Sequence, residues 1–139
     1  MRADEIMTRD VIAVRADQTV AEAIEVLVDR GFRHLPVLDD DDHVVGILSD
    51  RDVRALGVST ALDQRTREKL EARMRAPVAR LMSTGVATVR PETEVREIID
   101  TMLEAAVGAV PVVDHDTDTL IGIVSYVDVL RAVRDAAEA

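Results

Sequence analysis

The strongest constraint on the fold is that the second half of this chain repeats the first half. Identical residues recur in the same order, and a single inserted residue in an acidic turn interrupts the alignment. The repeated positions in the first copy are Met7, Val11, Val14, Arg15, Val20, Glu22, Ile24, Pro36, Val37, Asp39, Asp41, Gly46, Ile47, Ser49, Asp52 and Val53. An internal repeat of this length indicates a tandem duplication, so one small unit must fold twice.

The first copy begins with a predicted strand and helix. A run rich in Val and Ile at residues 11–14 predicts a short strand. Apolar residues at helical spacing follow over residues 20–28, behind a capping box formed by Thr19 and Glu22. We expect Gly31 to end this helix.

The rest of the copy predicts a hairpin and a second helix. Residues 35–38 and 44–48 predict two strands around an acidic turn, and Ser49 is expected to cap a helix over residues 50–56. The corresponding elements of the second copy are residues 86–89, 95–105, 110–113, 120–124 and 125–134. The predicted fold class is therefore mixed α/β (α+β), with two β-α-β-β-α repeats.

One copy alone has too little surface to bury around a three-stranded sheet, so we expect the two copies to pack against each other. Residues 63–75 are rich in charged helix formers and predict a solvent-facing connecting helix. The predicted division is a first repeat over 1–57, a connecting segment over 58–77, and a second repeat with a C-terminal helix over 78–139.

Composition argues against several classes of partner. The net charge is −10, from 17 basic and 27 acidic residues, and Phe32 and Tyr126 are the only aromatic residues, so we expect no nucleic acid. No apolar run approaches the roughly 18 residues needed to cross a membrane, and the N-terminus lacks an apolar signal segment. We therefore expect no membrane partner and a cytoplasmic location.

Metal chemistry is not predicted either. The chain has no cysteine, and the three histidines, His34, His43 and His115, lack a ligand spacing. The acidic turns at residues 39–42 and 114–118 have the composition of calcium ligands, but they lack the glycine and distal glutamate of an EF-hand loop.

The most informative pattern is glycine, two apolar residues, serine, any two residues and aspartate, which occurs once in each copy. It spans residues 46–52 and 122–128. Folding alone accounts for it, because serine and aspartate at this spacing cap a helix and glycine lets a strand approach a neighbour. The same geometry can present backbone N–H groups and a hydroxyl to an anion, and a carboxylate to a ribose diol. Both interpretations remain open at this point.

This pattern, together with the segment Arg33-His34-Leu35-Pro36-Val37 and the lead-in Ile6-Met7-Thr8, resembles the CBS domain, and the tandem pair resembles a Bateman module. The resemblance implies two β-α-β-β-α units packed about a pseudo-twofold axis. It also implies a homodimer and two clefts between the repeats that bind AMP, ADP, ATP or S-adenosylmethionine. The adenosyl nucleotide is a regulatory ligand, and no cofactor is required.

The resemblance assigns roles to residues of both copies. Asp52 and Asp128 would hold the ribose hydroxyls, and Ser49 and Ser125 would meet the phosphate. The wall of the adenine site would be formed by Asp10, Val11, Ile12, Leu35, Pro36, Gly85, Val86, Ala87, Val110 and Pro111. For the apolar members of this set, ordinary packing in the core is the alternative interpretation.

Basic partners for a phosphate are concentrated in the first copy. Arg33, His34 and Arg51 occupy positions that carry Gly108, Ala109 and Val127 in the second copy. If each site draws its basic groups from its own repeat, the first site should take the more phosphorylated ligand.

Three functions follow from these observations. The leading hypothesis is a non-enzymatic regulatory module that senses adenosyl nucleotides, signals through the conformation of its dimer and acts on an unknown protein partner. The alternative is a structural dimerisation module that binds no ligand. An enzyme comes third: His34, Ser49 and Asp52 are the residue types of a hydrolase triad, but no nucleophile-elbow sequence surrounds the serine.

Overall fold

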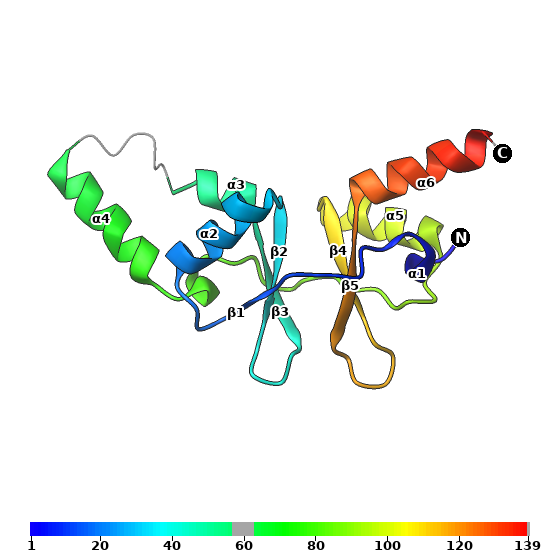
Figure 1. The fold of residues 1–139 in the computed structure, drawn as a ribbon, viewed down its shortest axis with the longest axis horizontal. Coiled ribbons are helices and arrows are strands. Elements are labelled where there is room, and N and C mark those ends of the chain that lie inside the picture. The colour runs from blue at the N-terminus through cyan, green and yellow to red at the C-terminus, as the bar shows by residue number, and fades with distance from the viewer. Residues whose placement is uncertain (57–62, 139) are drawn as a thin grey trace. The chain divides into compact units, whose positions relative to one another are not determined.

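The computed structural model describes residues 1–56 and 63–138, and it divides the chain into two compact units (Figure 1). Unit 1 consists of Met1–Val11 and Val86–Ala139, and unit 2 consists of Ile12–Gly85. The chain therefore passes from unit 1 to unit 2 after Val11 and returns after Gly85. Part of the predicted connecting segment, residues 58–62, lies outside the described residues.

Unit 2 contains the first repeat, and its first helix is capped as predicted. Helix α2 spans Val20–Arg30, and the Thr19 hydroxyl accepts a hydrogen bond from the backbone N–H of Glu22. The Glu22 carboxylate faces the backbone N–H of Thr19, which completes the capping box. Gly31 ends the helix in the left-handed conformation with φ of 66°, which glycine adopts without strain.

The sheet of unit 2 has the order β1-β2-β3. Strand β1 (Val14–Arg15) is parallel to β2 (His34–Leu38), and β3 (Val44–Ser49) is antiparallel to β2, which confirms the predicted hairpin. Ser49 caps helix α3 (Asp50–Arg54), which is shorter than predicted. Helix α4 (Gln64–Arg75) and the 3-10 helix η2 (Val78–Arg80) follow.

Unit 1 contains most of the second repeat and the N-terminus of the chain. Helix α5 (Val95–Ala105) has the predicted bounds, and β4 (Ala109–Val113) pairs with β5 (Leu120–Ser125) in an antiparallel hairpin. Helix α6 (Tyr126–Glu138) is longer than predicted. A short helix α1 (Ala3–Ile6), which the sequence analysis did not predict, contacts α6 and β5.

The first strand of each repeat differs from its prediction. Strand β1 starts only at Val14, and in the second repeat Val89 forms an isolated parallel bridge to Val112 instead of a strand over 86–89. The physical reason is the path of the chain. Residues 11–13 and 86–88 lie at the crossings between the units, so only the last residue of each apolar run reaches the edge of a sheet.

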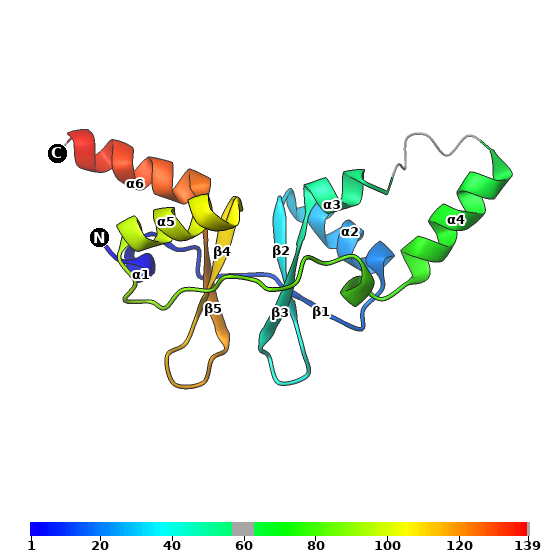
Figure 2. The same ribbon diagram turned by 180° about the vertical axis from the view of Figure 1, so that it is seen from behind.

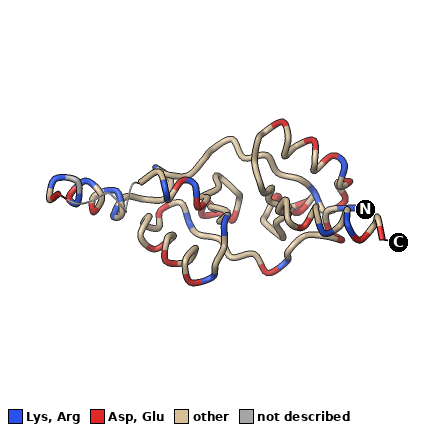
Figure 3. Tube along the Cα trace, turned by 90° about the horizontal axis from the view of Figure 1, so that it is seen from above, with Lys and Arg blue, Asp and Glu red and all other residues tan. Residues whose placement is uncertain are grey.

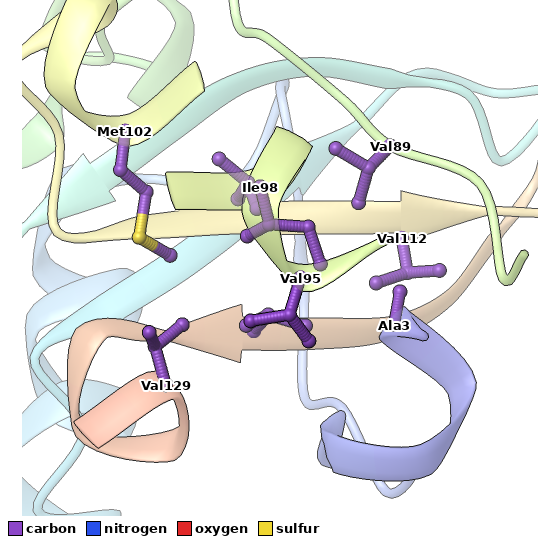
Figure 4. Close-up of a cluster of buried hydrophobic side chains, with 9 residues drawn as sticks. Ala3, Val89, Val95, Ile98, Met102, Val112 and Val129 are labelled. Atoms are coloured by element: carbon purple, nitrogen blue, oxygen red, sulfur yellow. The ribbon is translucent and has the colours of Figure 1, made fainter. Parts of the chain in front are cut away.

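Each unit has its own core of aliphatic side chains. In unit 1, Ala3 from α1 is fully buried beside residues from α5, β4, β5 and α6 (Figure 4). In unit 2, Val78 from η2 is fully buried beside residues from α2, β2 and β3. Ala3 and Val78 occupy equivalent positions of the two repeats, so each repeat's core is completed by the segment that precedes the other repeat.

These exchanged lead-in segments, residues 1–11 and 76–85, pair with the strands that carry the repeated motif. Ser83 and Ile47 exchange backbone hydrogen bonds of 2.9 and 3.0 Å, and Thr8 and Ile123 do the same with 2.9 and 3.0 Å. Figure 2 shows residues 76–85 in green, running from η2 past β3. The glycine of each motif lies at this contact: Gly46 faces Met82, and Gly122 faces Met7.

Helix α4 differs in charge from the rest of the chain. It carries five basic residues, Arg65, Arg67, Lys69, Arg73 and Arg75, against Glu68 and Glu71, and Figure 3 colours these positions by charge. All seven residues are exposed to solvent. This agrees with the predicted solvent-facing helix. Among the described residues, no helix is long and apolar enough to cross a membrane.

Replacing Gly46 with alanine is expected to lower the free energy of unfolding by about 1–3 kcal/mol, measured by chemical denaturation. The added Cβ would overlap the Met82 side chain and stand 3.0 Å from the carbonyl oxygen of Ser83. Met82→Ala supplies the matched control. If overlap with Met82 causes the loss, the double variant should be more stable than the two single losses predict, and strictly additive losses would contradict this contact.

Candidate functional site

The end of β3 and the start of α3 place Ser49 and Asp52 side by side. Asp52 Oδ2 accepts hydrogen bonds from the backbone N–H of Ser49 at 2.8 Å and from Ser49 Oγ at 3.1 Å. Ser49 Oγ accepts from the backbone N–H of Asp52 at 3.3 Å. Both side chains are partly buried, and this reciprocal capping fixes the hydroxyl and the carboxylate next to each other.

The second repeat builds the same pair with nearly the same dimensions. Asp128 Oδ2 accepts from the backbone N–H and the Oγ of Ser125 at 2.9 and 3.0 Å, and Ser125 Oγ accepts from the backbone N–H of Asp128 at 3.3 Å. The equivalent distances in the two repeats differ by 0.1 Å at most. The motif therefore specifies one local geometry twice.

Strand pairing brings His34 to this pair, and Arg33 and Arg51 are its basic neighbours in the sequence. His34 is directly opposite Ser49 in the β2–β3 ladder, so their side chains project from the same face of the sheet. The carbonyl oxygen of Arg33 accepts a 3.0 Å hydrogen bond from the backbone N–H of Asp50. Arg51 lies in the first turn of α3 and is exposed, and within the described residues it forms no ion pair.

The charged neighbours of His34 act on its pKa in opposite directions. Partial burial is the largest effect, and it lowers the pKa of the imidazole below its ordinary value. Asp50 raises the pKa, Arg33 lowers it and Asp52 raises it. His34 is therefore held mainly neutral at pH 7, although two carboxylates lie close enough to favour its charged form.

The same backbone positions in the second repeat carry no charge. Ala109 is opposite Ser125 in the β4–β5 ladder, and the carbonyl oxygen of Gly108 accepts a 2.8 Å hydrogen bond from the backbone N–H of Tyr126. Val127 replaces Arg51 in the first turn of the helix. The backbone of the site is thus preserved while its three basic side chains are absent.

The predicted adenine-wall residues fall into two sets by their place in the chain. One set lies at the crossings between the units: Asp10, Val11, Ile12, Gly85, Val86 and Ala87. The other set is fully buried in the strands: Leu35, Pro36, Val110 and Pro111. Leu35 and Val110 belong to the two cores, and the assignment of both sets to a ligand stays a prediction.

The acidic turns are stabilised by their own backbone. Asp39 Oδ1 accepts from the backbone N–H groups of Asp41 and His43 at 2.9 and 3.0 Å, and these bonds hold the pKa of Asp39 below its usual value. The ligand atoms of Asp39, Asp41 and His43 lie within 4.8 Å of one another, so they are the group in the described residues that could hold a metal ion. The hydrogen bonds from the backbone N–H groups explain why an aspartate stands at position 39, because its carboxylate stabilises the turn.

Two features near the site were not identified from the sequence. Met7 and Met82 pack against the motif glycines, and only the exchange of the lead-in segments brings them there. Unit 2 also contains a cavity of about 370 Å³ that no predicted site residue lines. Its walls are Val20, Ala55, Leu56, Ala72, Arg73, Ala76, Arg80 and Leu81.

Curated relatives match over nearly the whole chain. Inosine-5'-monophosphate dehydrogenase of Methanocaldococcus jannaschii is 34% identical over 130 residues, which cover 94% of this chain and 23% of that protein. Hypoxic response protein 1 of Mycobacterium tuberculosis is 28% identical over 135 residues, which cover 97% of this chain and 87% of that protein. The chain therefore spans about a quarter of the dehydrogenase and most of the second relative.

Solved structures share the fold over the same length. The structure of CBSX2 in complex with AMP is 29% identical, with a TM-score of 0.79 and 98% of both chains covered. A structure of the CBS-pair protein CBSX2 from Arabidopsis thaliana is 30% identical, with a TM-score of 0.81, and the match covers 99% of this chain and 97% of that one.

The family assignment rests on both halves of the chain. The model of the CBS domain matches residues 3–58 and again residues 78–135, which are the two copies that the repeat defined. The fold and the resemblance predicted from the motif are thereby confirmed. The chain belongs to the CBS-domain family, and it contains a tandem pair of these domains.

Proposed function

We propose that this chain is a regulatory module that binds an adenine nucleotide and has no catalytic activity of its own. The observation that carries the proposal is the pair of matching Ser–Asp geometries, Ser49 with Asp52 and Ser125 with Asp128. The AMP complex of CBSX2, which is similar over 98% of the chain, supports AMP as the first ligand to test. ADP, ATP and S-adenosylmethionine are the other candidates.

The hydrogen bonds of the Ser–Asp pair leave acceptor capacity for a ribose. An ionised carboxylate has about four acceptor positions on two oxygens, and the capping bonds to Asp52 and Asp128 use Oδ2. We assign Oδ1 of each aspartate to the ribose hydroxyls, and Ser49 and Ser125 to the phosphate end. Asp10, Val11, Ile12, Leu35, Pro36, Gly85, Val86, Ala87, Val110 and Pro111 complete the proposed adenine sites.

The same contacts argue against the serine as a nucleophile. Ser49 Oγ is 3.1 Å from Asp52 Oδ2 and accepts from the backbone N–H of Asp52, so both its donor and an acceptor position serve the helix cap. A triad would need the imidazole of His34 to accept the serine proton. Within the described residues the serine hydrogen bonds go to Asp52.

We also propose that the module acts as a homodimer, because apolar side chains are exposed at equivalent positions in and just after helices α2 and α5. Val28 and Leu103 are 73% and 74% exposed, and Phe32 and Val107 follow one turn later. Exposed apolar positions of this kind favour a partner surface. They also support the second candidate function, a dimerisation module in which the Ser–Asp pairs are only helix caps.

Calorimetric titration of the nucleotide-free protein with AMP tests the proposed function. We expect saturable binding, and we expect Asp52→Asn, Asp128→Asn or both to lower the affinity by about tenfold or more, because each removes a charge-assisted bond worth about 1.5–3 kcal/mol. Asparagine keeps an oxygen that can cap the helix. Asp29→Asn and Asp100→Asn are matched controls on exposed carboxylates. Absence of heat with AMP, ADP, ATP and S-adenosylmethionine in a folded protein would favour the ligand-free dimerisation module.

Sedimentation velocity over a range of protein concentrations tests the dimer. Val28→Glu combined with Leu103→Glu should shift the protein toward monomer, because two charges would have to be buried in the proposed interface. Ala136→Glu adds the same charge at an exposed position near the end of α6 and should leave the association unchanged. An unchanged dimer in the double variant would place the interface elsewhere.

A further inference from the structure

We propose that the two repeats take adenosyl ligands of different charge: the first repeat binds a ligand that carries a phosphate, and the second binds an uncharged nucleoside or thioether. This inference rests on the proposed function, because it assumes that both Ser–Asp pairs hold a ribose. It concerns the side chains next to each Ser–Asp pair.

The comparison is direct because the backbone at the Ser–Asp pair has the same local geometry in both repeats. The three bonds of each Ser–Asp pair agree within 0.1 Å, and each strand pairing puts one residue opposite the serine. That residue is His34 in the first repeat and Ala109 in the second. At the pair itself, the two repeats therefore differ in the side chains around it and not in the path of the chain.

The first repeat carries basic residues next to its Ser–Asp pair, in the strand ladder and in the sequence. Arg33 is tied to the start of α3 through its carbonyl oxygen, Arg51 follows in the first turn, and His34 faces Ser49. The carboxylate of Asp50 is engaged by Arg54 at 2.8 Å, so it is partly neutralised within its own helix. A phosphate beside Ser49 would meet guanidinium and imidazole donors, which form strong, short bonds to anions.

The second repeat provides no such groups. Gly108, Ala109 and Val127 stand at the three equivalent positions, and Tyr126 replaces Asp50. A phosphate there would find no cationic side chain at these three positions and would lie close to the carboxylate of Asp128. Removing a phosphate dianion from water without cationic partners is unfavourable, whereas an uncharged 5' group loses little by it.

The environment of His34 makes the first site sensitive to pH. In the free protein, burial lowers the pKa of the imidazole and keeps it mainly neutral. Asp50 and Asp52 raise this pKa, and Arg33 lowers it. A bound phosphate adds negative charge and favours the imidazolium, so binding should take up protons between the free and bound pKa values. The affinity for AMP should consequently rise as the pH falls through this interval.

Titrations with AMP and with adenosine, at pH 7 and above, test the inference. The variant Arg33→Gly/His34→Ala/Arg51→Val gives the first repeat the side chains of the second. We expect its affinity for AMP to fall about tenfold or more and its affinity for adenosine to stay within about twofold.

In the converse variant, Gly108→Arg/Val127→Arg, we expect a second AMP to bind per chain. Asp52→Asn should lower the affinity for AMP, and Asp128→Asn the affinity for adenosine, each by about tenfold or more.

Proton uptake gives an independent measurement. Titration of AMP in two buffers of different ionisation enthalpy should show net uptake in the wild type, and less in His34→Asn, while adenosine shows none from this source. Free AMP has the same proton equilibrium in both titrations, so the difference in uptake between the two proteins arises in the site. Equal AMP affinity at both repeats, or a triple variant with unchanged AMP affinity, would overturn the inference while leaving nucleotide binding intact. Failure of AMP and adenosine to bind at all would instead overturn the proposed function and this inference with it.

Discussion

The exchange of the two lead-in segments is the contact on which the rest of the structure depends. Residues 1–11 complete the core around the second repeat, and residues 76–85 complete the core around the first, with Ala3 and Val78 fully buried at equivalent positions. Each lead-in also pairs through two backbone hydrogen bonds with the strand that ends at the motif serine. That strand is consequently held on one side by its hairpin partner and on the other by the lead-in. The position of Ser49 or Ser125 at its end follows from both contacts.

This arrangement explains the glycine of the repeated motif in steric terms. A Cβ on Gly122 would stand 2.5 Å from Met7 Sδ, so Met7 would have to shift, and 3.1 Å from the carbonyl oxygen of Thr8, which is a tight contact. Glycine is therefore favoured because another segment of the chain passes directly over the strand. The serine and aspartate of the same motif are required by the helix that follows. Three motif residues thus have structural roles, and the proposed ligand site uses the groups that these roles have already positioned.

The elements that sequence reasoning predicted well are those set by local chemistry. The capping boxes at Thr19 and Ser49, the left-handed Gly31 and the bounds of α5 each depend on residues within one turn of the chain. The first strands were predicted too long, because whether Val11 or Val86 reaches a sheet depends on where the chain crosses between units. The repeat could not reveal which unit Met7 and Met82 join, since that is a property of long-range packing. Likewise, His34 could be identified as a basic residue from sequence, but its place opposite Ser49 follows from the register of β2 and β3.

Duplication explains how two sites with one backbone can differ in chemistry. The cores and caps restrict which residues can change: Leu35, Val110, Ser49 and Ser125 are buried or bonded in ways that the fold needs. Arg33 and Arg51 are exposed and belong to neither core, so core packing does not fix the residue types at these positions. The first copy has arginine and histidine at these positions, and the second has glycine, alanine and valine. Packing tolerates either set of side chains. Charge beside the Ser–Asp pair is therefore the property that can diverge between repeats while the geometry of the pair stays the same.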